Sequence, residues 1–150
     1  MKKIFILILY FLCLAINSGA QKGLNVSTLF SGEYNKNSNA VVVIMKGREL
    51  ESYKLSFFHS ISVKNSEYDV AKFEKAVLAD GKNAVNSKVI KNGNKVLAAY
   101  YQLPPALNSD KDANRFILFH KENSGNATII YLEGKTDLDA LIKIFINKKK

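Results

Sequence analysis

The pattern of apolar and polar positions predicts strands and helices along most of the chain. A continuous run of mostly β-branched residues, Ala40–Met45, is typical of a strand that is buried on both faces. Alternating apolar and polar positions predict further strands over 55–63, 85–91, 94–103, 115–121 and 127–133. Apolar residues at helical spacing predict helices over about 26–34, over 67–79 and after Thr136. Residues 48–54 fit neither pattern and leave room for one helical turn.

The predicted helices have recognisable ends. Asn65 or Ser66 can cap the second helix, and Gly81 can end it in a left-handed conformation. Thr136 and Asp139, three residues apart, resemble a shortened capping box for the last helix.

Asn92-Gly93 is the clearest turn signal in the chain. Both central positions of a type I′ turn need positive φ, which Asn and Gly tolerate. Such a turn places Val89 opposite Val96, and we expect the face that holds these valines to point towards the core. The opposite face then carries Lys88, Ile90, Lys95, Leu97, Ala99 and Tyr101.

The order of these elements predicts an α+β fold. Sequential strands joined by short hairpins indicate a single, mostly antiparallel sheet of about five to six strands. We expect two to three helices to pack on this sheet, on one face. No internal repeat or linker divides residues 21–150, so this stretch is expected to form one domain.

Residues 1–20 have the pattern of a secretory signal peptide. Two lysines precede thirteen apolar residues, Ile4–Ile16, and small residues follow. We expect cleavage between Ala20 and Gln21, which gives a periplasmic or secreted protein without a transmembrane segment.

Two other interpretations of this leader fit less well. A membrane-spanning helix needs about 20 apolar residues, and Asn17 interrupts the run before that length. The cysteine of a lipoprotein follows a leucine and two small residues, whereas Cys13 follows Tyr10-Phe11-Leu12 and lies inside the apolar run.

Cleavage changes the charge and the available chemistry. The remaining chain has 20 basic and 13 acidic residues, a net charge of +7. It also loses its only cysteine, which excludes disulfides, thiol nucleophiles and thiolate metal sites from the mature protein.

The two histidines are the remaining candidates for catalysis. His59 and His120 each lie in a predicted strand next to phenylalanines, and neither has a second ligand at a metal-binding spacing. A small hydrolase that uses one of them is the enzyme alternative, although the Gly-x-Ser-x-Gly motif is absent. We therefore expect no catalytic or metal-binding residues.

Other ligand motifs are incomplete or missing. Asn108, Asp110 and Asp112 resemble the start of a calcium loop, but the glycine and the final glutamate of that motif are missing. Neither a phosphate-binding loop nor a Gly-x-Gly-x-x-Gly motif occurs, so we expect no nucleotide and no cofactor.

The basic excess suggests a polyanion as an alternative partner. Lys88, Lys91, Lys95 and Tyr101 of the predicted hairpin would form a basic platform for such a ligand. Lysines on a hairpin also keep a protein soluble and block pairing of its edge, which we favour because lysines are spread along the whole chain. Export also argues against nucleic acid as the partner.

The chain resembles the small exported α+β domains of unknown function found in Gram-negative bacteria of the gut and mouth. The similarity lies in the signal peptide, the short first helix, Val41-Val42-Val43-Ile44, and the ending Thr128–Gly134 with the helix after it. It implies an envelope or secreted location and supplies no catalytic residues. We therefore expect a non-enzymatic binding or interaction module that recognises an envelope protein or an anionic polymer. The alternatives are a surface protein that binds lipopolysaccharide, anionic lipid or polysaccharide, and the small hydrolase.

Overall fold

Six strands and five short helices make up the described chain. The strands are β1 (Ala40–Lys46), β2 (Leu55–Val63), β3 (Asn86–Asn92), β4 (Lys95–Leu103), β5 (Asn114–Lys121) and β6 (Ala127–Gly134). The helices are α2 (Glu67–Gly81), α3 (Leu138–Asn147) and the 3-10 helices η3 (Asn25–Ser31), η4 (Glu33–Lys36) and η5 (Arg48–Tyr53).

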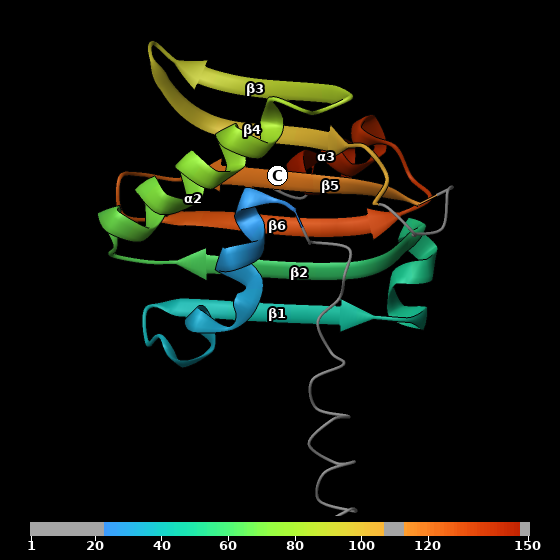
Figure 1. Cartoon of the computed structure of the whole chain (residues 1–150), viewed down its shortest axis with the longest axis horizontal. Coiled ribbons are helices and arrows are strands. Elements are labelled where there is room, and N and C mark those ends of the chain that lie inside the picture. The colour runs from blue at the N-terminus through green and yellow to red at the C-terminus, as the bar shows by residue number, and fades with distance from the viewer. Residues whose placement is uncertain (1–22, 107–112, 148–150) are drawn as a thin grey trace, which may run out of the picture.

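All six strands join in one antiparallel sheet with the order β1-β2-β6-β5-β4-β3 (Figure 1). This confirms the predicted α+β fold. The computed structural model describes residues 23–106 and 113–147. The predicted cleavage site at Ala20 and Gln21 and the acidic loop from Asn108 to Asp112 therefore lie outside the described residues.

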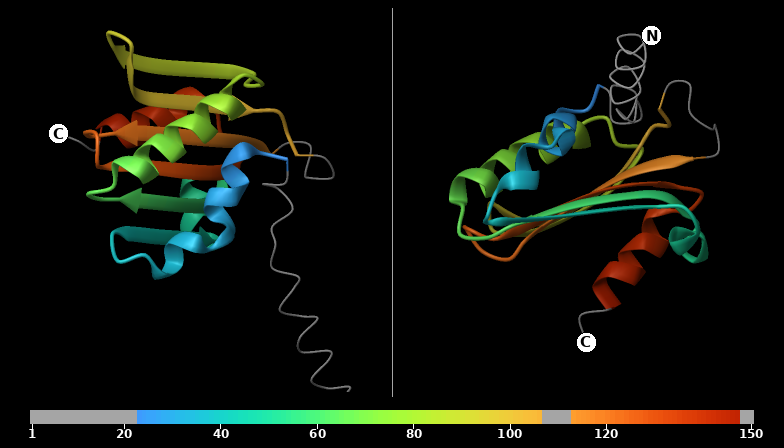
Figure 2. Two further views of the ribbon diagram at one scale, coloured as in Figure 1. Left: turned by 60° about the vertical axis from the view of Figure 1, so that its left-hand side comes forward. Right: turned by 90° about the horizontal axis from the view of Figure 1, so that it is seen from below.

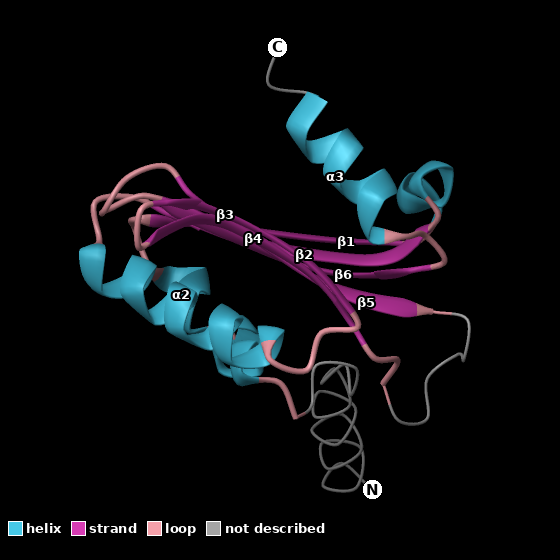
Figure 3. Ribbon diagram, turned by 90° about the horizontal axis from the view of Figure 1, so that it is seen from above, coloured by secondary structure: helices cyan, strands magenta, loops and turns pink. Residues whose placement is uncertain are grey.

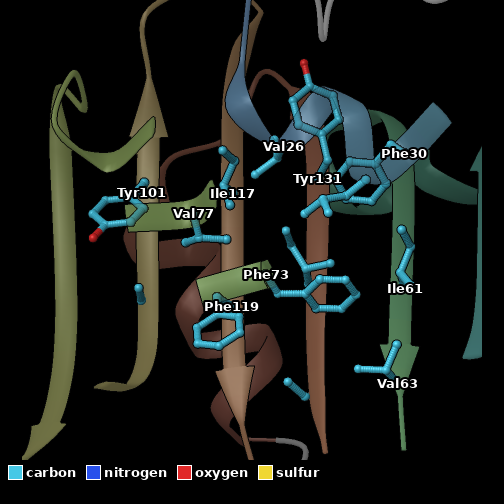
Figure 4. Close-up of a cluster of buried hydrophobic side chains, with 14 of the residues drawn as sticks. Val26, Phe30, Ile61, Val63, Phe73, Val77, Tyr101, Ile117, Phe119 and Tyr131 are labelled. Carbon is cyan, nitrogen blue, oxygen red and sulfur yellow. The ribbon is translucent and has the colours of Figure 1, made fainter. Parts of the chain in front are cut away.

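Helices cover both faces of the sheet, and not one face as the sequence pattern predicted (Figures 2 and 3). α2 packs with η3 on one face, where Phe73 and Val77 of α2 lie among sheet residues such as Ile117 (Figure 4). α3 and η5 pack on the other face, where Leu141 lies in a second cluster with Leu118. Ile117 and Leu118 are neighbours in β5 and both are buried, because each faces one of the two helical layers.

The two ends of α2 differ: a side chain caps the first turn, and the last residue packs closely against the sheet. The Ser66 hydroxyl accepts a hydrogen bond from the backbone N–H of Asp69 at 3.2 Å, so the prediction of a cap at Asn65 or Ser66 is confirmed for Ser66. The predicted left-handed cap at Gly81 is wrong, since Gly81 is the last helical residue and has no positive φ. Its role is a close approach: a Cβ atom there would lie 2.3 Å from the Tyr101 ring.

The predicted helix over 26–34 is split in two. Gly32 has φ 108°, a left-handed conformation, and separates η3 from η4. The hydroxyls of Ser27 and Ser31 donate hydrogen bonds to the carbonyls of Leu24 and Thr28, each at 2.6 Å. These bonds to the carbonyl three residues earlier compete with the backbone hydrogen bonds of an α-helix, which reach four residues back.

The β3–β4 hairpin differs from its predicted register. Gly93 and Asn94 form the turn, so Val96 lies opposite Lys91 and not opposite Val89. Leu97 is then an extra residue, because the next pair joins Ile90 to Ala98. This bulge reverses the faces of all later residues in β4.

β1 lies at the edge of the sheet, which corrects the prediction of a strand buried on both faces. Val41 is 60% exposed, Val43 is 40% exposed and Ile44 is 54% exposed. A continuous apolar run is typical of a central strand, whereas here it forms a solvent-exposed edge strand.

The last helix, α3, begins at Leu138, directly after the residue that caps it. The Asp137 carboxylate accepts a hydrogen bond from the backbone N–H of Ala140 at 2.8 Å, so this residue caps α3 in place of the predicted pair Thr136 and Asp139. Among the described residues, no helix is long and apolar enough to cross a membrane.

Candidate functional site

α3 is too short to cover its face of the sheet. Its ten residues extend about 15 Å, whereas the nine residues of β4 extend roughly 30 Å. Leu138 and Leu141 bury the first half of α3 against the sheet. Towards its C-terminal end the helix leans away from the sheet, as Figure 3 shows. Part of an apolar sheet face therefore remains open beside the helix.

This open region forms a groove with a volume of about 460 Å³, which we call the α3 groove. Its lining residues come from β3, β4, β5, the loop after β5, β6 and α3: Ile90, Leu97, Ala98, Tyr100, Leu118, Phe119, His120, Glu122, Thr128, Ile130 and Phe145. Volumes of this size are typical of small-molecule sites, which combine apolar walls with a few polar groups. A smaller cavity of about 220 Å³ lies on the other side of α3, between Phe58, Tyr53 and Ile144, and Phe145 borders both cavities.

The bulge in β4 increases the apolar surface of the groove. In a regular strand Leu97 and Ala98 would point to opposite faces. Because Leu97 has no partner residue in β3, both side chains lie on the α3 side and line the groove. The same bulge turns Tyr100 into the groove, where burial raises the pKa of its hydroxyl.

Polar residues border the groove at the end farthest from the start of α3. His120 lies opposite Thr128 of β6, and Thr128 lies opposite Ser62 of β2. The hydroxyls of Ser62 and Thr128 are 2.8 Å apart and form a hydrogen bond. Glu122, on the loop after β5, completes this polar border.

The structure separates the four residues of the predicted basic platform. Lys88 lies opposite Tyr100, which belongs to the α3-side cluster, so Lys88 is on the α3 side of the sheet. Lys95 lies opposite Asn92, nearer the turn of the hairpin, and is on the same side. Lys91 lies opposite Val96, a core residue on the α2 side. Tyr101 is 6% exposed and packs under Gly81 on the α2 side, so it belongs to the core.

His59 and His120 lie on opposite faces of the sheet. His59 is 7% exposed on the α2 side, with the Phe30 ring centroid 4.6 Å and the Phe57 ring centroid 6.1 Å from its own. Burial, and secondarily the positive charge of Lys46, lower the pKa of His59 to about 4. His59 is therefore a neutral core residue at neutral pH.

The groove offers a long apolar wall, a polar border and two lysines on the same face of the sheet. Within residues 23–106 and 113–147, no group of three histidine, cysteine or acidic residues is placed to hold a metal ion. The sequence pattern missed the groove, since its residues come from five elements between Ile90 and Phe145 and meet only in the folded sheet.

Comparison with known proteins places the chain in a family. No curated protein matches it, and no solved structure matches it. A family model described as "Family of unknown function (DUF6108)" matches residues 13–145, which is most of the chain and includes the whole sheet and most of α3. The chain therefore belongs to the family of unknown function DUF6108.

Proposed function

We propose that the protein is an exported envelope protein that binds a fatty acid, or a similar single-chain anionic lipid, in the α3 groove. The observation that carries this proposal is the groove itself: an apolar cavity of about 460 Å³ with lysines on the same face. The protein would act as a binding module, without catalysis.

The walls of the groove favour an acyl chain. Leu118, Ile130 and Phe145 form a continuous apolar surface between the sheet and α3. Burial of each methylene group of a ligand against such a surface contributes about 0.8 kcal/mol. A strongly polar ligand such as a sugar would lose its hydrogen bonds to water there without replacing them.

The surroundings of the groove favour an anionic head group. Lys88 and Lys95 lie on the same face as the groove and are exposed to solvent. A carboxylate or phosphate near them would stay hydrated while the acyl chain lies on the apolar wall. The net charge of +7 expected for the mature chain would also attract anions.

An anionic lipid fits better than the two alternatives. A purely electrostatic polyanion platform would need Lys88, Lys91 and Lys95 on one surface, and they lie on two faces. A hydrolase based on His59 would need a substrate within the aromatic core on the α2 side. His120 adjoins hydroxyl groups in the groove, so hydrolysis of an ester there would be the enzyme alternative.

Replacement of Ile90 by Asp is expected to weaken laurate binding at least tenfold. A carboxylate at position 90 places a charge on the apolar wall and repels the head group. The matched control is Val89→Asp. Val89 and Ile90 are adjacent in β3 and each is 38% exposed, but Val89 lies opposite Ala99 on the α2 side. We expect affinity within about twofold of the wild type for this control, measured by isothermal titration calorimetry.

A second pair of variants tests the head group. Lys88→Gln should weaken laurate binding and reduce its dependence on salt, whereas Lys91→Gln on the other face should change neither. The proposal fails if the wild-type protein does not bind laurate, or if the Val89 and Ile90 variants bind it equally well.

Export is tested by the start of the mature chain. Intact-mass analysis of protein recovered from its native host should show a chain that begins at Gln21, with or without cyclisation of the glutamine. Recovery of a chain that keeps Met1 would contradict export through a cleaved signal peptide.

A further inference from the structure

The two edges of the sheet differ in how well they are protected. β3, at one edge, carries Lys88 and Lys91 inside the strand and faces a bulge in β4. Lysines and bulges are standard ways to prevent an edge strand from pairing with another chain. β1, at the other edge, has no charged residue between Ala40 and Met45. Only β1 therefore offers an edge that another strand can extend.

Backbone hydrogen bonds show which groups of β1 face outwards. The N–H of Lys64 donates to the carbonyl of Asn39 at 2.9 Å, which makes these two residues a hydrogen-bonded pair. In an antiparallel ladder such pairs occur at every second residue, so Val41, Val43 and Met45 direct their backbone groups to β2. The N–H and C=O groups of Val42 and Ile44 then point away from the sheet.

We propose that β1 pairs with β1 of a second copy of this chain, antiparallel and about a two-fold axis through Val43. In this register Val42 lies opposite Ile44 of the other copy, so each outward N–H meets an outward carbonyl. Lys46 lies opposite Ala40 in the same register, and Val43 lies opposite Val43 on the axis. β1 runs from Ala40 to Lys46, and Val43 is its midpoint, so the pairing uses the whole strand. The two sheets become one continuous sheet.

The side chains of β1 suit a second copy. Pairing would cover Val41, Val43 and Ile44, the three exposed apolar side chains of the strand. It brings no like charges together inside the strand. Lys46 is the only charged residue of β1, and in this register it lies opposite Ala40 of the other copy. The charge pattern therefore permits self-pairing, which two copies of β3 with their lysines would oppose.

This dimer would present its binding sites together. A two-fold axis that relates antiparallel strands of one sheet runs perpendicular to that sheet, so the α3 sides of both copies face the same way. Both α3 grooves would open on one surface of the dimer. The inference does not depend on the ligand of the groove.

Sedimentation velocity over a concentration series tests the pairing on protein expressed from the full-length sequence. We expect a monomer–dimer equilibrium whose dissociation constant rises at least about tenfold in Val43→Lys, because two lysines would meet on the axis. The matched control is Val89→Lys on the β3 edge, since Val89 is 38% exposed and Val43 is 40% exposed. This control should dimerise as the wild type does.

A backbone variant separates strand pairing from simple apolar contact. Ile44→Pro removes an outward N–H and leaves the bonds between β1 and β2 in place, and we expect it to weaken the dimer about as much as Val43→Lys. Circular dichroism of each variant checks that the sheet is intact. A wild-type protein that stays monomeric at all concentrations, or a dimer that both β1 variants leave unchanged, would overturn the proposal.

Discussion

Replacement of Asp80 by Ala should lower the free energy of unfolding by about 3 kcal/mol or more, because it leaves buried hydrogen-bond donors without an acceptor. The Asp80 side chain is 4% exposed in the last turn of α2. Its carboxylate accepts hydrogen bonds from the backbone N–H groups of Asn25 at 2.7 Å and Val26 at 2.9 Å. It also accepts one from the side-chain amide of Asn25 at 2.8 Å.

This arrangement caps η3 from a distant part of the chain. The first N–H groups of a helix have no partners within the helix, and the residue before η3, Leu24, provides no side-chain cap. Asp80 supplies the acceptor, although a carboxylate at the end of α2 is unfavourable for the dipole of that helix. Loss of the carboxylate should release η3, which buries Leu29 and Phe30 in the α2-side core.

Urea denaturation of two further variants separates burial from capping. Asp80→Asn keeps one acceptor oxygen and should lose less stability than Asp80→Ala. Asp137→Ala removes an exposed carboxylate that bonds one backbone N–H of α3, and it should cost about 1 kcal/mol. Equal losses for Asp80→Ala and Asp137→Ala would show that the buried contacts of Asp80 contribute nothing extra.

His59 should make the protein less stable in acid, by about 2 to 3 kcal/mol between pH 7 and pH 4.5. The pKa of His59 is about 4 in the folded protein and 6.5 in an ordinary histidine. The unfolded chain therefore binds the proton first as the pH falls through 6.5. Stability decreases from there until the pH approaches 4, where the folded protein also becomes protonated.

The variant His59→Leu isolates this contribution from that of the carboxylates. Leucine fills a similar space among Phe30 and Phe57 and cannot be protonated. The difference in unfolding free energy between variant and wild type, from urea titrations at several pH values, should change in favour of the variant as the pH falls. If both proteins lose stability in parallel from pH 7 to pH 4.5, His59 is not held neutral by its surroundings.

Local sequence signals predicted the elements whose boundaries depend on neighbouring residues. The α2 cap at Ser66 was predicted, and so was the break between the strands over 115–121 and 127–133, which is the loop Glu122–Asn126 in the structure. A helix cap and a short hairpin are determined within a few residues. The position of β1 was not, since an apolar strand is the same locally at an edge or in the centre. Only the strand order, which depends on distant pairings, decides between them.

The hairpin shows how one residue limits prediction of a site. The predicted pattern placed Lys88, Ile90, Lys95 and Leu97 on one face, and the register in the structure agrees. After the bulge at Leu97 every face is reversed, so Tyr101 enters the core and Tyr100 lines the groove. The bulge lets β4 bury Tyr101 against α2 and Tyr100 on the α3 side, and this packing between distant elements leaves no local signal.

A two-dimensional NMR titration of the isotope-labelled protein with laurate tests most directly whether the α3 groove is the ligand site. We expect saturable shift changes at amides around Ile90, Leu118, Ile130 and Phe145, with small changes in η3 and at Phe73 of α2 on the opposite face. An absence of saturable changes, or changes centred on the α2 side, would show that the α3 groove is not the ligand site.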